Sequence, residues 1–495
     1  MRNGQQYRDS LRDGRTVYVY GERVPDVTTH PAFRGIVDTV ADLYDYASDP
    51  ANGMVHTNPD TGTPGNKAFL IPRRPDDLRA RREAIRAWAR RTNGLVGRGP
   101  DHVASVLAGI ASGPEVLARG RPEFGENAVR FYRRMVAEDL YFTYVIIPPQ
   151  VDRTQSAAGQ EDAFTQVGVV REQDGGIVVR GAQMLGTAAP ISNWLFVSCI
   201  VPLRPGDEDY ANTFLVPIDA TGLKFYARPP YAMGRPSTYD YPLSTRFDET
   251  DSLVVFDDVF VPWENVFVYR DVGLLRAQYF ETASHVLGNN QAQIRLAVKL
   301  QFVAGLARKI AATTRIDTFP AVQERLGELA SLAAIIEGME LASEAAATVD
   351  QFGVLRPDPR YLYAANGFQA ELYPRALHIL RELAGGGVIQ VPSSYKELVA
   401  PETAADVRRY VRSPGVPAEE RVKLYKLAWD VIGTEFAGRH EQYEMFYAGA
   451  PYVAKTYAYR NYRYEEAVQL VDDLLATYGL EDVAARTPEP PATGA

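Results

Sequence analysis

Arg98 and His102 carry the side chains whose type and spacing most clearly indicate chemistry. Residues 97–102, GRGPDH, interrupt an amphipathic helical pattern. Pro100 and Asp101 suit the first turn of a new helix, where a missing N–H is harmless and an anion meets the helix dipole. Arg98 would lie just outside this helix start and His102 just inside it. We therefore expect the guanidinium and the imidazole to lie close enough to share one ligand.

Arg295 and Lys299 form a second pair, four residues apart in a predicted helix. Residues at this spacing share one helical face. The pair could bind the phosphate groups of a ligand, or it could be solvated surface charge. The pattern leaves both interpretations open.

The remaining motifs narrow the chemistry by exclusion. No GxGxxG follows a predicted strand, and the sequence has no phosphate-binding loop, HExxH or nucleophile elbow. The six histidines are scattered, so we predict no metal site. The single cysteine, Cys199, excludes a disulfide framework and a cysteine-ligated cluster within one chain. The glycines at 385–387 lack the context of a dinucleotide-binding turn and favour a close-packed bend.

The composition is typical of a soluble globular enzyme. The 495 residues exceed the usual size of a single core, and 46% of them are apolar and 23% charged. A net charge of −9 argues against a nucleic-acid partner, whose phosphates require basic patches. Residues 1–6 are polar, and no apolar run approaches a membrane span, so we expect no membrane association and a cytoplasmic location.

The hydrophobic pattern divides the chain into three parts that would position these residues. Residues 1–147 are expected to be mainly helical, with one helix over 78–91 and another running from about Asn127 to Tyr144. Residues 148–270 show the period of strands, at 177–180, 194–200 and 212–216, and then at 253–256 and 259–261 as two strands joined through Asp257 and Asp258. Residues 271–480 show amphipathic helical repeats typical of a bundle, and 481–495 are expected to be a disordered tail. The predicted fold class is α+β, mainly α.

Several blocks of sequence resemble one enzyme family in the same order. The stretch 239–271, YDYPLSTRFDETDSLVVFDDVFVPWENVFVYRD, is the most informative of them. The others are DGR at 13–15, YVYGERV at 18–24, DVTTHPAF at 26–33, IRLAVKL at 294–300, VQ at 322–323 with LGE at 326–328, VPSS at 391–394 and WDVIGTEFAGRHE at 429–441. Together they resemble the oxygenase components of the 4-hydroxyphenylacetate 3-monooxygenase family.

This resemblance implies a fold, a reaction and partners. The fold would be acyl-CoA dehydrogenase-like, with an N-terminal helical domain, a middle β-domain and a C-terminal helical bundle. The enzyme would use FADH2 from a separate flavin reductase together with O2, and would hydroxylate a small aromatic, phenolic substrate through a flavin C4a-hydroperoxide. Members of the family assemble as homo-oligomers, so we expect a dimer or a dimer of dimers.

The resemblance also assigns the candidate site residues. Arg98 stands where the family has an arginine that contacts the phenol oxygen, whereas His102 stands at the matching tyrosine position and Tyr144 at the matching histidine position. These three are the predicted catalytic residues, with two members of the set exchanged. The predicted cofactor-binding residues are Thr187, Arg295, Lys299, Gly386 and Tyr447, of which Tyr447 could equally serve helix packing.

Three alternatives remain open at this point. The exchange of His102 and Tyr144 could reflect a monooxygenase acting on a non-phenolic substrate, such as an indole, a pyrrole or an amine. The chain could be an acyl-CoA dehydrogenase-type oxidase, which would hold oxidised FAD tightly. It could also be a family member that has lost activity and acts only in binding or assembly.

Overall fold

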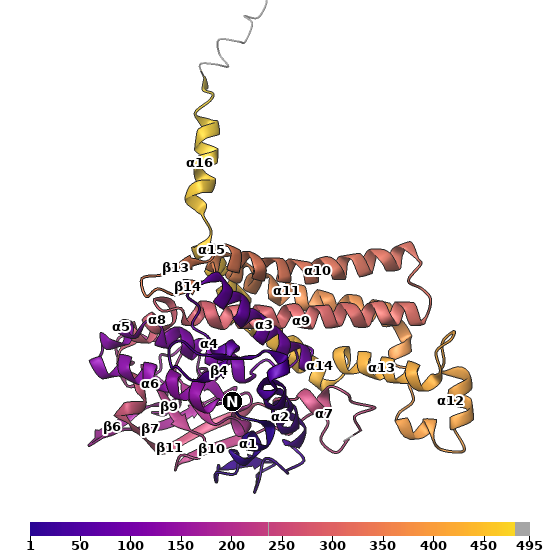
Figure 1. Ribbon diagram of the computed structural model, residues 1–495, viewed down its shortest axis with the longest axis horizontal. Helices are drawn as coiled ribbons and strands as arrows, with labels where there is room; N and C mark the ends of the chain where they lie inside the picture. Colours follow the sequence, from indigo (N-terminus) through magenta and orange to yellow (C-terminus); the bar gives the residue numbers. More distant parts are fainter. Residues whose placement is uncertain (236, 481–495) are drawn as a thin grey trace, which may run out of the picture.

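The computed structural model describes residues 1–235 and 237–480 and arranges them as helices, then two sheets, then helices (Figure 1). It is 52% helical and 14% strand, which confirms the predicted α+β, mainly α class. The predicted tail at 481–495 lies outside the described residues. No helix within the described ranges is both long enough and apolar enough to span a membrane.

Six α-helices lie in the first 147 residues. They are α1 Gly4–Asp9, α2 Arg34–Ser48, α3 Pro75–Arg91, α4 Pro100–Ala111, α5 Pro114–Ala118 and α6 Pro122–Glu138. The predicted helix start at Pro100 is confirmed. The predicted helix over 127–144 is wrong at its end, because α6 stops at Glu138 and Asp139 takes a left-handed φ of 52°. Residues Phe142–Val145 form strand β5 instead, since this aromatic and β-branched run pairs in parallel with another strand.

The strands form two large sheets. The six-stranded sheet has the order β2-β1-β10-β11-β7-β6 and the four-stranded sheet the order β12-β9-β8-β5. Their bounds are β1 Val17–Val19, β2 Glu22–Arg23, β5 Phe142–Val145, β6 Gly168–Gln173, β7 Gly176–Gln183, β8 Trp194–Val197, β9 Thr213–Pro217, β10 Leu223–Ala227, β11 Ser252–Pro262 and β12 Val266–Val268. Small hairpins add β3 Val55–Thr57 with β4 Pro64–Asn66, and β13 Thr348–Val349 with β14 Leu355–Arg356.

Two features of these sheets differ from the sequence-based expectation. The two strands predicted around Asp257 and Asp258 are a single strand, β11, whose pairing with β7 shifts between Phe256 and Val259. One extra residue forms a bulge, with Asp258 at a left-handed φ of 53°. In addition, strands β1, β2 and β5 come from the first 147 residues but lie in the sheets of the middle part. The predicted boundary at 147 stays a prediction.

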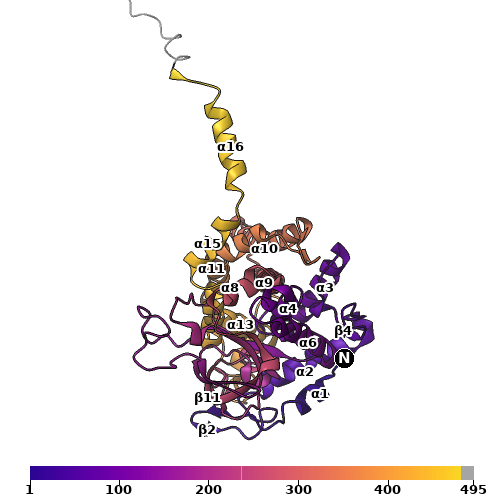
Figure 2. The same ribbon diagram turned by 90° about the vertical axis from the view of Figure 1, so that its left-hand side faces the viewer.

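Helices return after the sheets. They are α8 Val272–Phe280, α9 Ser284–Thr313, α10 Pro320–Ala345, α11 Pro359–Ala384, α12 Ala404–Tyr410, α13 Ala418–Ile432, α14 Glu435–Phe446, α15 Pro451–Asn461 and α16 Tyr464–Leu475, with the short α7 Ser244–Phe247 between β10 and β11. Helix α9 packs against α3, α4, α10 and α11 and so links the N-terminal helices to the C-terminal bundle. Helix α16 stands apart from the body (Figures 1 and 2).

The contact between α4 and α9 sets the position of the site. Helix α4 is buried along its whole length, including the polar residues of its first turn. Gly109 lies directly on the start of α9, where an added Cβ would come within 2.3 Å of the Ser284 backbone. This close approach needs glycine, and it brings the first turn of α4 next to the middle of α9.

Candidate active site

The start of α4 brings the three predicted catalytic residues together. The Nη1 atom of Arg98 lies 2.7 Å from Nε2 of His102. The ring of Tyr144, on β5, meets the imidazole edge-on at a centroid distance of 5.2 Å, and Cζ of Arg98 lies 4.8 Å from the same ring. A helix start and an adjacent strand therefore place a guanidinium, an imidazole and a phenol in one cluster, which we call the Arg98 cluster.

Two tyrosines from α14 and its C-terminal end complete the Arg98 cluster. Cζ of Arg98 lies 5.1 Å from the ring centres of both Tyr443 and Tyr447. Nε2 of His102 also lies 3.2 Å from the hydroxyl of Tyr447. Across the part of the chain that the structure describes, no carboxylate oxygen lies within 4.0 Å of the Arg98 guanidinium. The cation is thus surrounded by ring faces, which attract it without neutralising it.

His102 is a neutral hydrogen-bond acceptor at one nitrogen and a donor at the other. Burial, together with the positive charges of Arg98 and Arg295, lowers the pKa of His102 well below its ordinary value. Arg98 can only donate, so Nε2 must accept, and the ring proton must sit on Nδ1. That Nδ1 atom is buried without a hydrogen-bond partner. The described residues therefore leave this N–H donor unpaired.

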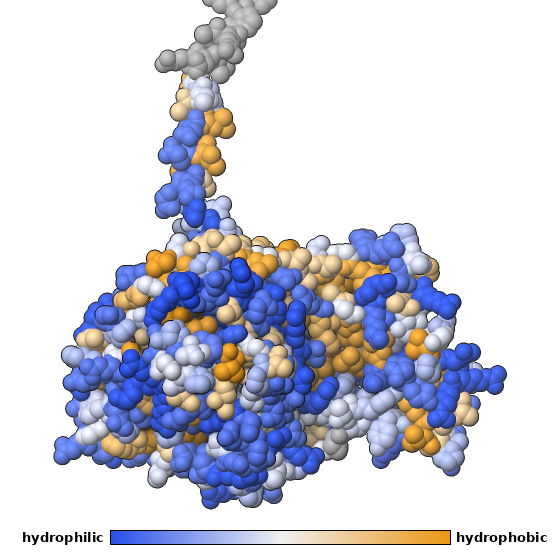
Figure 3. All heavy atoms as spheres, in the orientation of Figure 1, coloured by the Kyte–Doolittle hydropathy of each residue, from blue (hydrophilic) through white to orange (hydrophobic). Residues whose placement is uncertain are grey.

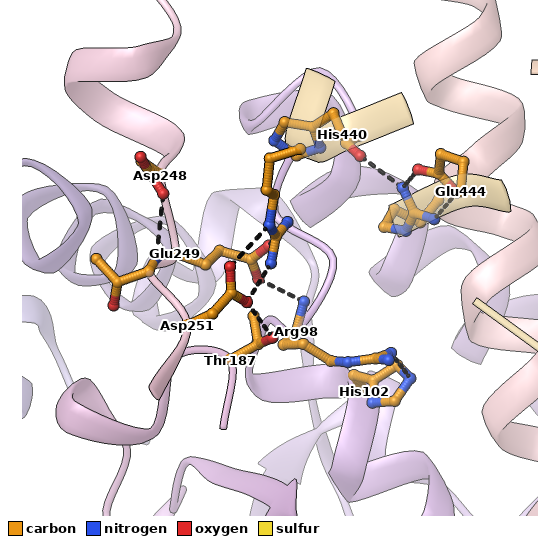
Figure 4. A network of polar contacts seen from close by, with 12 residues as sticks. Arg98, His102, Thr187, Asp248, Glu249, Asp251, His440 and Glu444 are labelled. Carbon is orange, nitrogen blue, oxygen red and sulfur yellow. Dashed lines mark hydrogen bonds and ion pairs between the residues drawn. The ribbon is translucent and has the colours of Figure 1, made fainter. Parts of the chain in front are cut away.

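The main chain at Arg98 is held from two sides. Its N–H donates to Oε1 of Glu249 over 2.5 Å, and its carbonyl accepts from the hydroxyl of Tyr141 over 2.5 Å. Figure 4 shows Glu249 between Arg98 and the acidic residues that follow α7. The side chain of Arg98 can respond to a ligand while its backbone stays fixed.

Thr187 lies in the same network, on the turn after β7. Its hydroxyl donates to Oδ1 of Asp251 over 2.6 Å (Figure 4). Burial alone would raise the pKa of Asp251, but the guanidinium groups of Arg439 and Arg228 hold it well below its usual range. Asp251 is therefore a carboxylate that fixes the orientation of the threonine hydroxyl.

The turn that carries Thr187 has an unusual backbone. Leu185 and Ala188, on either side of it, take left-handed φ values of 59° and 61°. Thr250, across from them, has a φ of 53°. The hydroxyls of Thr250 and Ser252 are buried with no hydrogen-bond partner. Strained backbone and unpaired buried hydroxyls commonly mark ligand sites.

Arg295 and Lys299 are buried and paired within the protein. Arg295 is 1% exposed and Lys299 0%, which overturns the interpretation as solvated surface charge. Arg295 makes two bonds to the carboxylate of Glu444, of 2.7 and 2.9 Å, and Lys299 lies 2.8 Å from the same carboxylate. Both cations contact this one buried carboxylate. Their predicted contact with the cofactor stays a prediction.

The pKa values of this second group agree with internal pairing. Burial lowers the pKa of Lys299 to about 8. Burial would raise the pKa of Glu444, but Arg295 and Lys299 lower it to about 2. Nδ1 of His440 accepts a hydrogen bond from Lys299 over 3.1 Å, because burial and the nearby cations keep the pKa of this imidazole well below its ordinary value. We call these four residues the Glu444 cluster.

Gly386 lies away from both clusters. It belongs to a short 3-10 turn, Gly385–Val388, that follows α11, and it is exposed. A cleft of ≈ 240 Å³ lies beside this turn. Its lining consists of Asp240, Tyr241, Val388, Ile389, Val391, Pro392, Ser393, Lys426 and Trp429.

Sequence reasoning missed the acidic part of the site. Glu249 and Asp251 connect Arg98, Thr187 and Arg439, of which the sequence analysis singled out only the first two. The signal was the run Asp248-Glu249-Thr250-Asp251 immediately before β11, where so many carboxylates need nearby cations once buried. No group of His, Cys, Asp and Glu suited to a metal ion is found in residues 1–235 and 237–480.

Comparisons with protein families and characterised relatives agree with each other. The model of the 4-hydroxyphenylacetate 3-hydroxylase N-terminal region matches residues 3–268, and that of its C-terminal region matches residues 275–476. A 4-nitrophenol 2-monooxygenase oxygenase component from Rhodococcus sp. is 39% identical, over 90% of this chain and 86% of its own. The 4-hydroxyphenylacetate 3-monooxygenase oxygenase component of Klebsiella oxytoca is 36% identical over the same shares. A monooxygenase from Streptomyces globisporus, named for a carrier-bound (3S)-3-amino-3-(3-chloro-4-hydroxyphenyl)propanoyl group, is 38% identical over 90% of this chain and 84% of its own.

Solved structures give the same result. An oxygenase component of 4-hydroxyphenylacetate 3-monooxygenase complexed with FAD superposes with a TM-score of 0.92 at 33% identity, covering 98% of this chain and 100% of that one. A complex with FAD and 4-hydroxyphenylacetate gives 0.91 at 33%, covering 96% and 99%. The fold is therefore acyl-CoA dehydrogenase-like, as expected. An archaeal 4-hydroxybutyryl-CoA dehydratase from N. maritimus, at 0.88 and 20% identity, shares the fold alone.

Proposed function

Because this chain belongs to the 4-hydroxyphenylacetate 3-hydroxylase family, we propose that its Arg98 cluster holds the oxygen of a phenol while the neighbouring ring carbon is hydroxylated. The chain is a flavin-dependent aromatic monooxygenase, the oxygenase component of a two-component enzyme that uses FAD and O2. The three relatives named above act on phenols with a substituent opposite the hydroxyl group, according to their names. We extend that substrate class to this chain.

The single observation that supports a phenol is the unneutralised cation of Arg98. A guanidinium with no carboxylate partner, enclosed by the rings of Tyr144, Tyr443 and Tyr447, favours the ionised form of a phenol placed against it. A phenolate pushes electron density onto the ring carbons next to the oxygen. Those carbons then react with an electrophilic oxygen atom. Arg98 would thus raise the reactivity of the substrate as well as hold it.

In the structure without substrate, the position of His102 does not leave it free to act as a general base. Its Nε2 is occupied by Arg98, and its Nδ1 carries the proton. We infer that Nδ1–H donates to the phenol oxygen. His102 can act as the base only if the substrate hydroxyl takes the place of Arg98 on Nε2. Because the imidazole stays neutral at working pH, either role is available without a protonation step.

We propose that Tyr447 lies beside the substrate. Its hydroxyl lies 3.2 Å from Nε2 of His102 and 3.4 Å from the carbonyl of Gly288, and its predicted role in cofactor binding stays a prediction. Burial raises its pKa well above the ordinary value, so it stays a neutral phenol. A neutral hydroxyl already carries its proton, so we propose that Tyr447 orients the imidazole and does not take the substrate proton.

The residues around Thr187 fit the polar edge of a flavin. Reduced FAD, when bound, supplies two electrons that activate O2, one atom of which becomes the new hydroxyl group and the other water. The Gly186 N–H donates to the Ser252 carbonyl over 2.9 Å and the Ala188 N–H to the Thr250 carbonyl over 3.3 Å, so the two residues with unpaired hydroxyls pair with the two neighbours of Thr187. We propose that these three hydroxyls bind the polar edge. Because the Thr187 proton is committed to Asp251, its oxygen is left to accept from a flavin N–H.

The remaining partners follow from the two-component class. A separate reductase would supply FADH2, and we propose that the chain is a homo-oligomer, a dimer of dimers being the expected form. We propose that the cleft beside Gly386 binds a part of FAD that is distant from its isoalloxazine ring. The predicted division into 1–147, 148–270 and 271–480 is retained as a proposal.

Incorporation of oxygen from labelled O2 tests the proposed substrate class. The purified chain, an unrelated flavin reductase, NADH and FAD would be supplied with 18O2 and with 4-hydroxyphenylacetate or 4-nitrophenol. We expect a product heavier by one 18O atom. The matched control is 4-methoxyphenylacetate, whose ether cannot form a phenolate and should not react.

Three outcomes would replace the proposal with one of the alternatives. Equal turnover of the methoxy compound, or turnover of an indole or amine but no phenol, would indicate a non-phenolic substrate. Reduction of tightly bound FAD by an acyl thioester would indicate an oxidase. Failure to bind FADH2 would indicate a protein that acts only in binding or assembly.

A further inference from the structure

Glu249 contacts both halves of the proposed site. Its main-chain carbonyl accepts a hydrogen bond from the Ala188 N–H over 3.1 Å, on the turn that carries Thr187. Its side chain accepts from the Arg98 N–H over 2.5 Å, just before the start of α4. Figure 4 shows Glu249 reaching Arg98 with Thr187 nearby. One residue therefore joins the turn that would face the flavin to the cluster that would hold the phenol.

Thr143 makes a second connection of the same kind. Its hydroxyl donates to the Thr187 carbonyl over 2.8 Å. The next residue along β5 is Tyr144, whose ring lies in the Arg98 cluster. Thr143 and Glu249 are each 1% exposed, so neither belongs to the largely hydrophilic surface in Figure 3. The turn at Thr187 is thus tied to the Arg98 cluster by two buried links from different parts of the chain.

The carboxylate of Glu249 is placed for the main chain of Arg98 more than for an ion pair. Nη1 of Arg439 lies 3.4 Å from Oε2 of Glu249, whereas Nη2 of Arg439 lies 2.8 Å from Oδ1 of Asp251. The main-chain nitrogen of Arg98 is nearer to Glu249 than either, at 2.5 Å. Arg439 therefore has its closest anion in Asp251, and the shortest contact of the Glu249 side chain is with Arg98.

The backbone where Glu249 meets the turn is strained. The Ala188 N–H is shared between the carbonyls of Glu249 and Thr250, at 3.1 and 3.3 Å. Ala188 and Thr250 both take left-handed φ values, of 61° and 53°, which are unfavourable for residues with a Cβ. Such conformations persist only where the surrounding contacts determine them. The junction is therefore held in one geometry.

Oxygen transfer between two bound molecules depends on the distance between their reacting atoms. A misplacement of about 1 Å can cost roughly a hundredfold in rate, even when both molecules stay bound. The two links run from one binding region to the other, and each ends on a main-chain atom rather than on a ligand-binding side chain. They can therefore fix this distance without contacting either ligand.

We propose that Glu249 and Thr143 are positioning residues that set the distance between the flavin edge at Thr187 and the phenol oxygen at Arg98. This inference rests on the proposed function for the identity of the two ligands, and it adds two residues that touch neither of them. Loss of a link should leave both ligands bound but misplaced. Reduced flavin would then still pass two electrons and two protons to O2, and H2O2 would form instead of the hydroxylated product.

Two variants of Glu249 separate the length of the side chain from its charge. Glu249→Asp keeps the carboxylate but is one methylene shorter, whereas Glu249→Gln keeps the length and an acceptor oxygen but loses the charge. We expect product per FADH2 oxidised to fall about tenfold or more in the aspartate variant. The glutamine variant should stay within about threefold of the unmodified chain, since the acceptor for the Arg98 N–H is retained.

The affinity of each site is measured separately for these variants. Anaerobic titration with FADH2, and with 4-nitrophenol in the absence of flavin, should give dissociation constants within about threefold of the unmodified chain. The reverse order, with a normal yield in the aspartate variant and a low yield in the glutamine variant, would show that charge matters and would overturn the proposal. A loss of affinity large enough to explain the low yield would also overturn it.

Thr143→Val tests the second link. It removes the hydroxyl at nearly constant size, and Thr143→Ser is the control that keeps the hydroxyl. Because one neutral hydrogen bond is lost, we expect the product yield of the valine variant to fall about fivefold. The serine variant should recover most of the yield. Equal yields in the two variants would remove Thr143 from the proposal.

Hydrogen exchange tests the links without turnover. FADH2 bound anaerobically should slow amide exchange in the peptide around Arg98, because the flavin restrains the turn at Thr187 and Glu249 passes this restraint to the start of α4. In Glu249→Asp the turn should still gain protection, but the Arg98 peptide should not. Exchange at Arg98 that does not respond to FADH2 in the unmodified chain would overturn the proposal. A chain that shows this protection but hydroxylates no phenol would overturn the proposed function alone.

Discussion

The Arg98 cluster and the Glu444 cluster contain the same kinds of residue but serve different purposes. Each has an arginine, and each has a histidine whose ring nitrogen accepts a hydrogen bond from a cation. In the Glu444 cluster a carboxylate lies 2.7 Å from Arg295 and 2.8 Å from Lys299. Among the described residues, rings and an imidazole surround the Arg98 guanidinium, and the Glu249 carboxylate bonds the Arg98 main chain instead. The buried carboxylate beside its cations makes the Glu444 cluster an internal structural contact. Without such a carboxylate on its guanidinium, the Arg98 cluster can bind an anion.

The two clusters are also physically connected. Glu444, Tyr443 and Tyr447 lie on consecutive turns at the end of α14, so the helix that is tied to α9 through Glu444 also presents the two rings to Arg98. The Glu444 cluster thus positions the Arg98 cluster. Substitutions in the Glu444 cluster should lower the free energy of unfolding. Substitutions in the Arg98 cluster should lower the transfer of oxygen to the substrate.

Removing the carboxylate of Glu444 should have the largest effect on stability. Glu444→Ala leaves Arg295 and Lys299 buried with no anion, which typically costs about 3–5 kcal/mol. Urea unfolding measures this loss. The control is Glu371→Ala, whose partner Lys455 lies on the surface, and it should cost less than about 1 kcal/mol. Equal losses would show that the Glu444 cluster is not a support.

Acid should destabilise the fold through its buried imidazoles. The pKa of His440 is well below its ordinary value in the folded chain, so between that value and about 6.5 the unfolded chain binds more protons. Stability therefore falls as the pH is lowered from 7. His440→Gln should reduce the difference in unfolding free energy between pH 7 and pH 5 by up to about 2 kcal/mol. Above about pH 8, plots of unfolding free energy against pH should run parallel for the unmodified chain and His440→Gln. A difference in slope there would count against His440 as the cause of the acid sensitivity.

Removing the hydroxyl of Thr187 should have the smallest effect. Thr187→Val loses one acceptor for the flavin and one bond to Asp251, worth about 1 kcal/mol, so FADH2 should bind roughly fivefold more weakly. Thr187→Ser keeps the hydroxyl and serves as the control. Anaerobic titration with reduced flavin measures both. Unchanged affinity in the valine variant would remove Thr187 from the flavin site.

The sequence was sufficient for features that depend on local patterns. Pro100 and Asp101 correctly predicted the start of α4, and with it the proximity of Arg98 and His102. The order of helices, sheets and helices followed from periodicity, and the fold followed from the resemblance. The exchange of His102 and Tyr144 between two positions was read from aligned blocks, and both side chains reach the same cluster.

The failures have a common physical cause, which is tertiary pairing. Arg295 and Lys299 have a spacing that is also typical of solvated surface charge, and only Glu444, 145 residues beyond Lys299, reveals that they are buried and paired. Phe142–Val145 continued a helical pattern, but pairing with β8 makes it a strand. The run over 253–261 looked like two strands because a bulge resembles a turn when its partner strand is unknown. None of these partners is adjacent in the sequence.

The yield of hydroxylated product per FADH2 oxidised, measured for Arg98→Ala by rapid mixing with O2, tests the central claim most directly. Without the cation, flavin oxidation should continue at nearly the normal rate, while the product yield falls about ten- to a hundredfold and H2O2 takes its place, since a charge-assisted hydrogen bond contributes about 1.5–3 kcal/mol. Arg98→Lys, which keeps the charge, should recover part of the yield. A normal yield in Arg98→Ala would contradict the account, because the substrate oxygen would then not depend on the one cation that the Arg98 cluster provides.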